Sequence, residues 1–272
     1  MPDTWIHLTA RVAPGAPDLT REDTGEWLWP RLHETFPDAL ASELMPNHPH
    51  VVKASRDPDA DAERLARLLG HFGRCFGVGG QVSIVSTRAI EDRQKLHRHI
   101  RYVALNPCRE RLASCPLAWT WSTHRDVVGA SVDPWVTADR LARALQRSTR
   151  DFAELHHAYV SADPSAHVAG TPFPQTAVTQ AIAKAPLDAV HDAAVAALRF
   201  RRDAVRERGP ARALFVALAF DQGWTRVSHL AQICGCGDDA IRRYAALDAG
   251  ASLAAARMCL GDERLRRHHD PA

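Results

Sequence analysis

The alternation of hydrophobic and polar residues predicts strands and helices in the first half of the chain and helices alone in the second. Period-two alternation and short apolar runs predict strands at 5–12, 39–45, 48–55 and 81–87. Apolar side chains at helical spacing predict helices at 24–36, 61–76 and 90–105. We expect the last of these helices to stop at Asn106, because Pro107 cannot continue it. This order predicts an α+β fold with helices packed on a small antiparallel sheet.

The second half of the chain lacks the period-two alternation that predicts strands. Helices are predicted at 137–147 and 149–160, followed by a loop rich in Pro and Gly at 161–175 and by Ala-rich helices over 186–265. We therefore expect an α+β domain over 1–130, a helical extension and linker over 131–185, and an all-α domain over 186–272.

Composition narrows the class of protein. The chain of 272 residues is 46% hydrophobic and 24% charged, as in ordinary globular proteins. Its formal net charge is only +2, so affinity for a polyanion must come from local clusters of basic residues. The cysteines have no C-x-x-C spacing, which argues against a zinc ribbon or a disulfide framework. Without a signal peptide or a membrane-length apolar stretch at any position, we expect a cytoplasmic protein with no membrane partner.

Two histidines one residue apart form the first candidate site. On a strand, His48 and His50 would point to the same face roughly 6.5 to 7 Å apart, within reach of one divalent transition metal. Two ligands make an incomplete site. The alternative is that they are only two polar residues on an exposed strand face.

The second candidate pair is Tyr102 and Asn106, which on a helix are i and i+4 and therefore share one face. Alone, they are equally typical of a packed tyrosine followed by a helix-ending Asn-Pro. Together with His48 and His50 they fit nuclease chemistry. A divalent ion held by the histidines and Asn106 could bind a phosphate oxygen and hold the phosphorus in line with the Tyr102 hydroxyl, which is otherwise a poor nucleophile.

These two blocks also carry a family resemblance. The segment LMPNHPHVV, followed later by RYVALNPCRERLASCPLAWTWST, resembles the single-tyrosine HUH transposases of the insertion-sequence-200 type, and most closely the REP-associated tyrosine transposases. Their usual pattern joins Met-Pro-Asn-His-hydrophobic-His to a helix with Arg-Tyr-Ile and Asn-Pro-x-Arg and then to a Trp-Ser-Ser run. The resemblance covers residues 5–160 and implies an HUH, ferredoxin-like nuclease core over 1–130.

The resemblance also implies roles for individual residues. His48 and His50 would be the metal ligands, Asn106 the third ligand, and Tyr102 the nucleophile, with Mg²⁺ or Mn²⁺ as cofactor. The reaction would be cleavage of single-stranded DNA, with the 5′ phosphate of one fragment held on tyrosine and a 3′ hydroxyl left on the other. The partner would be single-stranded DNA, with hairpin-forming repeats as the expected target.

Two departures from the family pattern weaken these implications. Pro49 replaces a bulky aliphatic residue between the histidines, and we expect the missing N–H to remove one ladder hydrogen bond and loosen the pair. Residues 70–86 lack the usual Gly-His-Leu-Trp block. The alternative function is therefore a catalytically weakened, domesticated DNA-binding regulator derived from such a transposase. A third interpretation, an unrelated metal hydrolase, leaves Tyr102 and Asn106 unexplained.

Basic residues cluster around Tyr102 and could hold a DNA backbone without reading its sequence. These candidate DNA contacts are Arg88, Arg93, Lys95, Arg98, Arg101, Arg109 and Arg111. The alternative is a solvated helix face. Nearby, Trp119 and Trp121 could stack on bases or belong to the core.

The C-terminal region contains a second candidate DNA contact. Residues 212–250 have the order helix, tight GCG turn, helix, and resemble a helix-turn-helix module in which 238–248 would enter the major groove with Arg242 and Arg243 pointing outward. A plain helical packing module is the alternative. The sequence does not decide whether the protein is a monomer or a homodimer.

Overall fold

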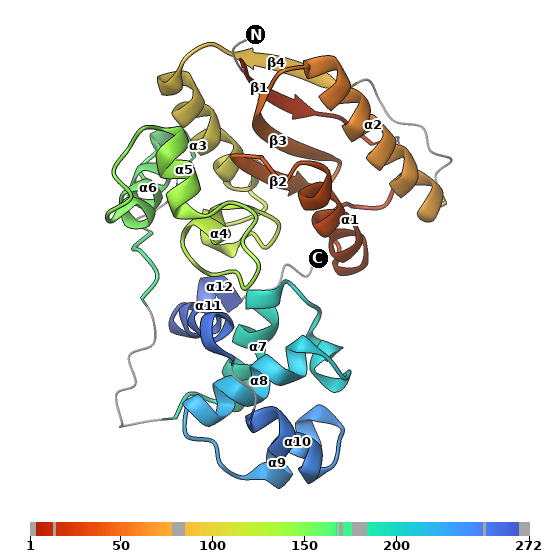
Figure 1. The fold of residues 1–272 in the computed structure, drawn as a ribbon, viewed down its shortest axis with the longest axis vertical. Helices are drawn as coiled ribbons and strands as arrows, with labels where there is room; N and C mark the ends of the chain where they lie inside the picture. The colour runs from red at the N-terminus through yellow and green to blue at the C-terminus, as the bar shows by residue number, and fades with distance from the viewer. Residues whose placement is uncertain are drawn as a thin grey trace.

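The structure, a computed structural model, describes residues 4–12, 15–77, 85–166, 168, 171–175, 184–246 and 249–266. A sheet with helices on it forms one part of the molecule, and a bundle of helices forms the other (Figure 1). No helix of the described part is long and apolar enough to cross a membrane. All the cysteines are free thiols, as expected.

Four antiparallel strands form the sheet, in the order β2-β3-β1-β4. They are β1 (Thr4–Thr9), β2 (Ala41–Met45), β3 (His48–Ser55) and β4 (Ser86–Ile90). Helices α1 (Glu22–Thr35) and α2 (Pro58–Cys75) lie on one face, and α3 (Arg93–Arg109) lies on the other (Figure 1). The predicted α+β fold with a small antiparallel sheet is confirmed.

Strand alternation assigns the side chains to the two faces. Ile6, Leu8 and Val51 face α1 and α2, where they join a buried apolar core. On the same face Lys53 donates to the buried Asp61 carboxylate of α2 at 2.9 Å. The opposite face carries His50 and its neighbours toward α3. The polar site therefore lies on the α3 side of the sheet.

Most element boundaries differ from the sequence-based predictions by a few residues, and the differences at α2 and β4 are informative. Helix α2 begins at Pro58 rather than 61, because the Asp57 carboxylate caps it by accepting from Ala60 N at 3.0 Å. Strand β4 runs over Ser86–Ile90 instead of 81–87, and residues 78–84 of the departing 70–86 segment lie outside the described residues.

The prediction that the third helix stops at Asn106 is wrong. Helix α3 continues through Pro107 to Arg109, and Glu110 N still donates to Asn106 O at 2.9 Å. Proline lacks an N–H, so the helix loses one hydrogen bond at Pro107, yet it continues for two more residues. Asn106 is consequently a rigid position inside a helix rather than part of a loop.

Trp119 and Trp121 belong to the core and are not exposed stacking platforms. Both are nearly inaccessible, and their indole nitrogens donate to Leu44 O at 2.8 Å and Thr20 O at 2.9 Å. A Cβ at Gly25 would lie 2.4 Å from the Trp121 ring, so glycine is required where α1 passes over it.

The rest of the chain is helical, as predicted. Its longer helices are α5 (Ala138–Ala144), α6 (Phe152–Ser161), α7 (Leu187–Leu198), α8 (Pro210–Asp221), α9 (Val227–Cys234), α10 (Asp238–Ala245) and α11 (Gly250–Gly261). The short helices are α4 (His124–Val127) and α12 (Glu263–Arg266), with 3₁₀ turns at Pro116–Ala118, Pro164–Ala166 and Arg202–Arg206. Helices α7 to α12 enclose a second apolar core that also includes Leu117 and Val128.

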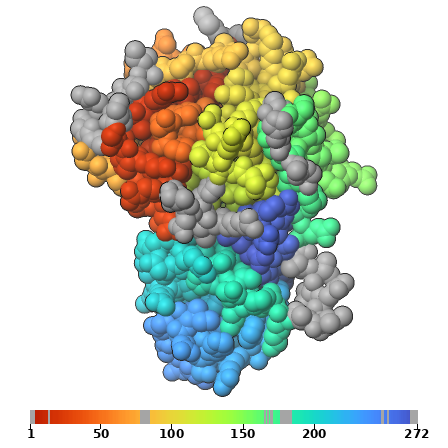
Figure 2. Space-filling view, turned by 180° about the vertical axis from the view of Figure 1, so that it is seen from behind, coloured from red at the N-terminus to blue at the C-terminus, as the bar shows by residue number. Residues whose placement is uncertain are grey.

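Buried polar contacts join the two parts. Arg199, in the left-handed cap of α7, donates to the buried Asp126 carboxylate at 2.5 Å and to Thr120 O at 2.9 Å. Arg125 is fully buried and donates to Leu265 O at 2.7 Å. In the space-filling view the two parts lie against each other (Figure 2). The division at 130 and 185 stays a prediction.

Candidate functional site

The structure brings together the three residues that the sequence proposes as metal ligands. His48 and His50 share the α3-facing side of β3, and their ring centroids are 4.6 Å apart. Asn106 reaches them from α3, with its amide nitrogen 3.1 Å from His50 Nε2. Asn106 and His50 are both buried, at 6% and 4% exposure. A helix and a strand thus converge on one point.

The amide orientations of Asn106 and Asn47 assign a tautomer to each ring. An amide nitrogen only donates, so His50 Nε2 accepts from Asn106 and the proton of His50 lies on Nδ1. His48 Nδ1 lies 2.5 Å from Asn47 Oδ1, which only accepts, so its proton is also on Nδ1. Both histidines therefore carry their lone pair on Nε2, as in a metal-ligating pair.

Two further histidines extend this network, and the sequence analysis missed both. His7 of β1 lies with Nε2 2.8 Å from His50 Nδ1, and His99 of α3 has Nε2 3.0 Å from His7 Nδ1. The run Asn106–His50–His7–His99 is continuous. His7 was detectable as the polar residue between Ile6 and Leu8, but its contact with His50 depends on the register of β1 against β3.

Burial keeps these imidazoles neutral. Loss of solvation lowers the pKa of His7 to about 3 and that of His50 to about 2, and each is lowered further by neighbouring histidines. Burial also lowers the pKa of His48 and of His99. Neutral rings are the form that can bind a metal ion.

On the β2 side, Pro49 removes no hydrogen bond from the sheet. Leu44, its partner on β2, has its backbone turned away from β3, because Leu44 N donates to Trp121 O at 3.0 Å and Leu44 O accepts from the Trp119 indole at 2.8 Å. The Leu44–Pro49 pair is therefore a non-hydrogen-bonded pair. The missing N–H would point toward β1, whose pairing with β3 ends at Thr9 and His50. Beyond this point the two segments still run side by side, because Val12 N donates to Asn47 O at 2.9 Å. The interruption opposite Pro49 fits the expected loss of one ladder hydrogen bond, on the β1 side only.

Tyr102 lies one helical turn before Asn106 on α3 and is 43% exposed. Its ring centroid is 5.8 Å from that of His99, so it adjoins the outer end of the histidine network. The Arg109 guanidinium lies 4.8 Å from the Tyr102 ring centroid and donates to Tyr102 O at 3.0 Å. This arrangement leaves one face of the phenol accessible to solvent while fixing its position along the helix.

The candidate DNA contacts fall into two groups. Arg101 and Arg109 are half-buried and both pair with the Asp163 carboxylate, at 3.2 and 3.1 Å. Lys95 pairs with Glu91, and Arg93 donates to Ala144 O at 3.3 Å. The remaining arginines of this cluster are exposed and have no ion pair within the described part of the chain: Arg88, Arg98 and Arg111. Arg88 lies directly opposite His7, on the histidine face of the sheet.

Glu43 is a buried carboxylate beside the histidines that the sequence analysis also missed. It lies directly opposite His50 on β2 and is completely buried. Neither of its oxygens has a hydrogen-bonding partner of good geometry among the residues that the structure describes. Burial raises the pKa of Glu43 well above its usual value, while the Ser122 hydroxyl and the Arg109 charge act in the opposite direction.

The donor set fits a divalent metal in part. His48 and His50 present Nε2 lone pairs, and Asn106 would supply its amide oxygen after its side-chain amide turns over. Among the described residues, no three His, Cys, Asp or Glu side chains already surround a common point. Any site here therefore depends on Asn106 as its third ligand.

Comparisons with known proteins place this chain in no family. No family model matches it, and no curated protein matches it. One solved structure is similar: the REP-associated tyrosine transposase bound to a REP hairpin, with 19% sequence identity, a TM-score of 0.39, and coverage of 46% of this chain and 79% of that one.

Helices α9 and α10 form the helix-turn-helix arrangement that the sequence predicts. Leu230 and Ile241 are buried between them, and Gly235 adopts φ +60° at the turn. Arg242 is exposed but pairs with Asp239 at 2.7 Å and with Asp238 at 3.9 Å. Arg243 is exposed without an ion pair to any residue that the structure describes, and 247–248 lie outside those residues. Acidic partners thus neutralise part of the charge expected to face DNA.

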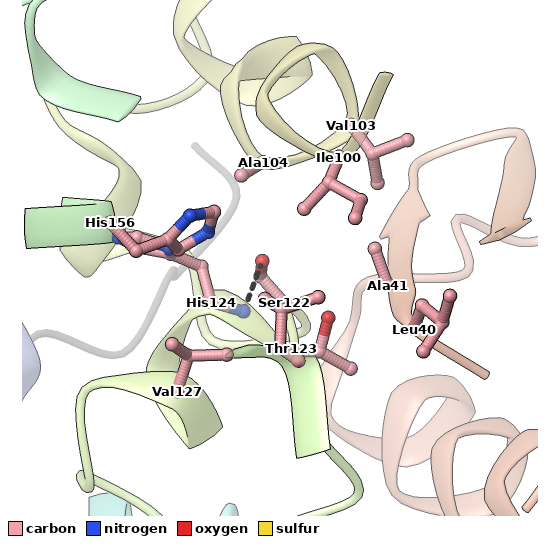
Figure 3. A pocket seen from close by; sticks show the side chains of 11 residues that line it. Leu40, Ala41, Ile100, Val103, Ala104, Ser122, Thr123, His124, Val127 and His156 are labelled. Atoms are coloured by element: carbon pink, nitrogen blue, oxygen red, sulfur yellow. Dashed lines mark hydrogen bonds between the residues drawn. The ribbon is translucent and has the colours of Figure 1, made fainter. Parts of the chain in front are cut away.

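A second histidine cluster lies behind the site, between α3, α4 and α6. His124 and His156 are fully buried, and both line a cavity of about 10 Å³ (Figure 3). His124 Nε2 is 2.9 Å from His157 Nδ1. Within the described part of the chain, Nδ1 of His124 and Nδ1 of His156 have no hydrogen-bonding partner. Burial lowers the pKa of both buried rings, to about 3 for His156.

Proposed function

We propose that the chain is a metal-dependent endonuclease and strand-transfer enzyme for single-stranded DNA, with Tyr102 as the covalent nucleophile. The single observation that supports this proposal most is the contact between His50 and Asn106, 56 positions apart in the chain, beside an exposed Tyr102 on the same helix. A packed tyrosine and two solvated histidines would require none of this convergence.

The chemistry assigns each residue one task. The Tyr102 hydroxyl attacks a backbone phosphorus, a new O–P bond forms, and the bond to the 3′ oxygen breaks. The phenolic proton passes to solvent, and the departing 3′ oxygen takes up a proton. His48, His50 and Asn106 would hold Mg²⁺ or Mn²⁺, which supplies charge stabilisation for the reacting phosphate. The reverse attack by a 3′ hydroxyl rejoins the strand without ATP.

Exposed cations near Tyr102 support single-stranded DNA as the substrate. Arg88, Arg98 and Arg111 are available to phosphate, whereas Arg101 and Arg109 are engaged with Asp163. We propose hairpin-forming repeats as the target, following the motif resemblance, and we leave the helix-turn-helix arrangement of α9 and α10 as a second, weaker contact.

A covalent-trapping experiment tests the proposal. Labelled single-stranded hairpin DNA incubated with the protein and Mn²⁺ should give an adduct on SDS gels with the wild type, and none with Tyr102→Phe or His50→Ala. Tyr159→Phe is the matched control, because Tyr159 lies near Arg101 but outside the histidine network, and it should retain the adduct.

Two results would contradict the proposal. Binding of the hairpins without any adduct from the wild type, across a broad panel, would favour the alternative of a DNA-binding regulator without catalysis. An adduct that survives Tyr102→Phe would show that another residue is the nucleophile.

A further inference from the structure

Two arginines of α3 stand beside Tyr102. Arg101 is the residue directly before it, and Arg109 donates to Tyr102 O at 3.0 Å with its guanidinium 4.8 Å from the Tyr102 ring centroid. Their side chains are 24% and 23% exposed. Cations in this position could hold a DNA phosphate next to the exposed phenol, because arginine contacts the backbone without reading its sequence.

Both guanidinium groups converge on one oxygen atom. Arg101 Nε lies 3.2 Å from Asp163 Oδ2, and Arg109 Nη2 donates to the same oxygen at 3.1 Å. Two arginines around a single anionic oxygen would hold a phosphate oxygen equally well, because the guanidinium group matches carboxylate and phosphate alike. Arg101 and Arg109 thus form an anion-binding subsite, and the Asp163 carboxylate fills it.

Asp163 reaches this subsite from a different element. It follows α6 and lies 54 positions after Arg109 in the chain. Helix α6 packs beside α3, and Arg101 also lies over the ring of Tyr159 of α6, 4.3 Å from its centroid (Figure 1). The Asp163 side chain is only 8% exposed. A phosphate could therefore enter the subsite only by displacing the carboxylate, since two anions would repel each other there.

We propose that Asp163 occupies a phosphate subsite beside Tyr102 and keeps Arg101 and Arg109 from contacting DNA in the free protein. The inference rests on the proposed function, because single-stranded DNA is the polyanion that the subsite would bind. Release of Asp163 would expose two further cations next to the nucleophile. Binding of a phosphate there is therefore coupled to movement of the segment that follows α6.

Fluorescence anisotropy with a labelled oligothymidine tests this role in the full chain, over a salt series and in EDTA so that no strand is cut. Asp163→Asn keeps the shape of the side chain and removes its charge. Each phosphate contact to a single strand adds about 0.7 to the log–log salt slope, so two freed arginines should steepen it by about 1.4. Binding at about 0.1 M salt should then be about 25-fold tighter than that of the wild type.

Two controls separate freed arginines from a general change of charge. Glu110→Gln removes the same charge from an exposed acid immediately after α3, and it should change the slope by less than about 0.3 because solvent screens that carboxylate. Adding Arg101→Gln and Arg109→Gln to Asp163→Asn should return the slope to within about 0.3 of the wild-type value, because the gain depends on these two cations.

A folded Asp163→Asn variant with the wild-type slope would overturn the inference and show that the contact only anchors α6 to α3. If thermal unfolding shows that Asp163→Asn does not fold, Arg101→Gln and Arg109→Gln in the wild type decide instead. Unchanged slopes support a closed subsite, and decreases of about 0.7 for each arginine overturn it. A steeper slope for Asp163→Asn without any covalent adduct on hairpin DNA would remove the nuclease activity and leave the subsite standing.

Discussion

Acid should unfold this protein through the buried histidines behind the proposed site. His156 of α6 is fully buried and stacks on Phe152 with ring centroids 5.4 Å apart, and its Nδ1 has no hydrogen-bonding partner among the described residues. The titratable groups that face it are His97, His124 and His157, all with lowered pKa. The adjoining cavity of about 10 Å³ holds at most one water molecule, so a charge on His156 would be poorly solvated.

The sign follows from the lowered pKa. Burial lowers the pKa of His156 from 6.5 to about 3, so between these values the unfolded chain binds a proton that the folded protein does not. The stabilisation is complete above pH 6.5 and is lost as the pH falls toward 3. Lowering the pH from about 7.5 to about 5 should cost about 2 kcal/mol of unfolding free energy from this residue alone. His124 acts in the same direction.

Urea unfolding at a series of pH values measures this effect. His156→Phe keeps an aromatic ring and cannot titrate, so its unfolding free energy should fall by about 2 kcal/mol less than that of the wild type over the same interval. His71→Asn, which replaces an exposed histidine of α2, should reproduce the wild-type slope. The reasoning is refuted if His156→Phe and wild type lose equal free energy, whatever their difference at pH 7.5.

Two further predictions concern charge pairs. Arg199→Met should lower the free energy of unfolding in urea by about 3 to 5 kcal/mol, because it leaves the buried Asp126 carboxylate without its cation. Arg201→Met, at the exposed pair with Asp203, should lower it by less than about 1 kcal/mol. Similar losses for the two variants would contradict the view that burial makes the Arg199–Asp126 pair the more important one. Arg98→Gln should reduce the salt dependence of single-stranded DNA binding by about 0.7 in log–log slope, measured by fluorescence anisotropy, while Arg101→Gln should change it much less because Asp163 already neutralises Arg101. Equal slopes for the two variants would show that ion pairing in the free protein does not decide which arginines meet DNA.

The sequence predicted the fold and the meeting of His50 with Asn106, but not the rest of the site. Period-two alternation identifies strands, and the i, i+4 rule identifies the shared face of Tyr102 and Asn106. The contacts of His7 and Glu43 with His50 depend on how three strands align, and alternation within one strand carries no information about that register.

Long-range ion pairs also explain why only some of the predicted DNA-contacting arginines are free in the part of the chain that the structure describes. The sequence places Arg101 and Arg109 in a basic run. Nothing nearby in the sequence indicates that both pair with Asp163, which follows α6 more than fifty residues later. The end of α3 was mispredicted for a related reason. Proline penalises a helix locally, yet buried contacts of Val103, Leu105 and Cys108 hold the last turn in place.

Pro49 illustrates how backbone direction decides what a substitution costs. A proline in a central strand should remove one ladder hydrogen bond, and β3 lies between β2 and β1. Leu44, however, donates its N–H to Trp121 O and accepts from the Trp119 indole with its C=O. Its carbonyl is therefore not available to an N–H at residue 49. On the other side, the pairing of β1 with β3 stops at Thr9 and His50, and Val12 N then donates to Asn47 O at 2.9 Å in the same register. The cost of the proline is therefore confined to one hydrogen bond on the β1 side, and the pairing of β3 with β2 still runs through His48 and His50.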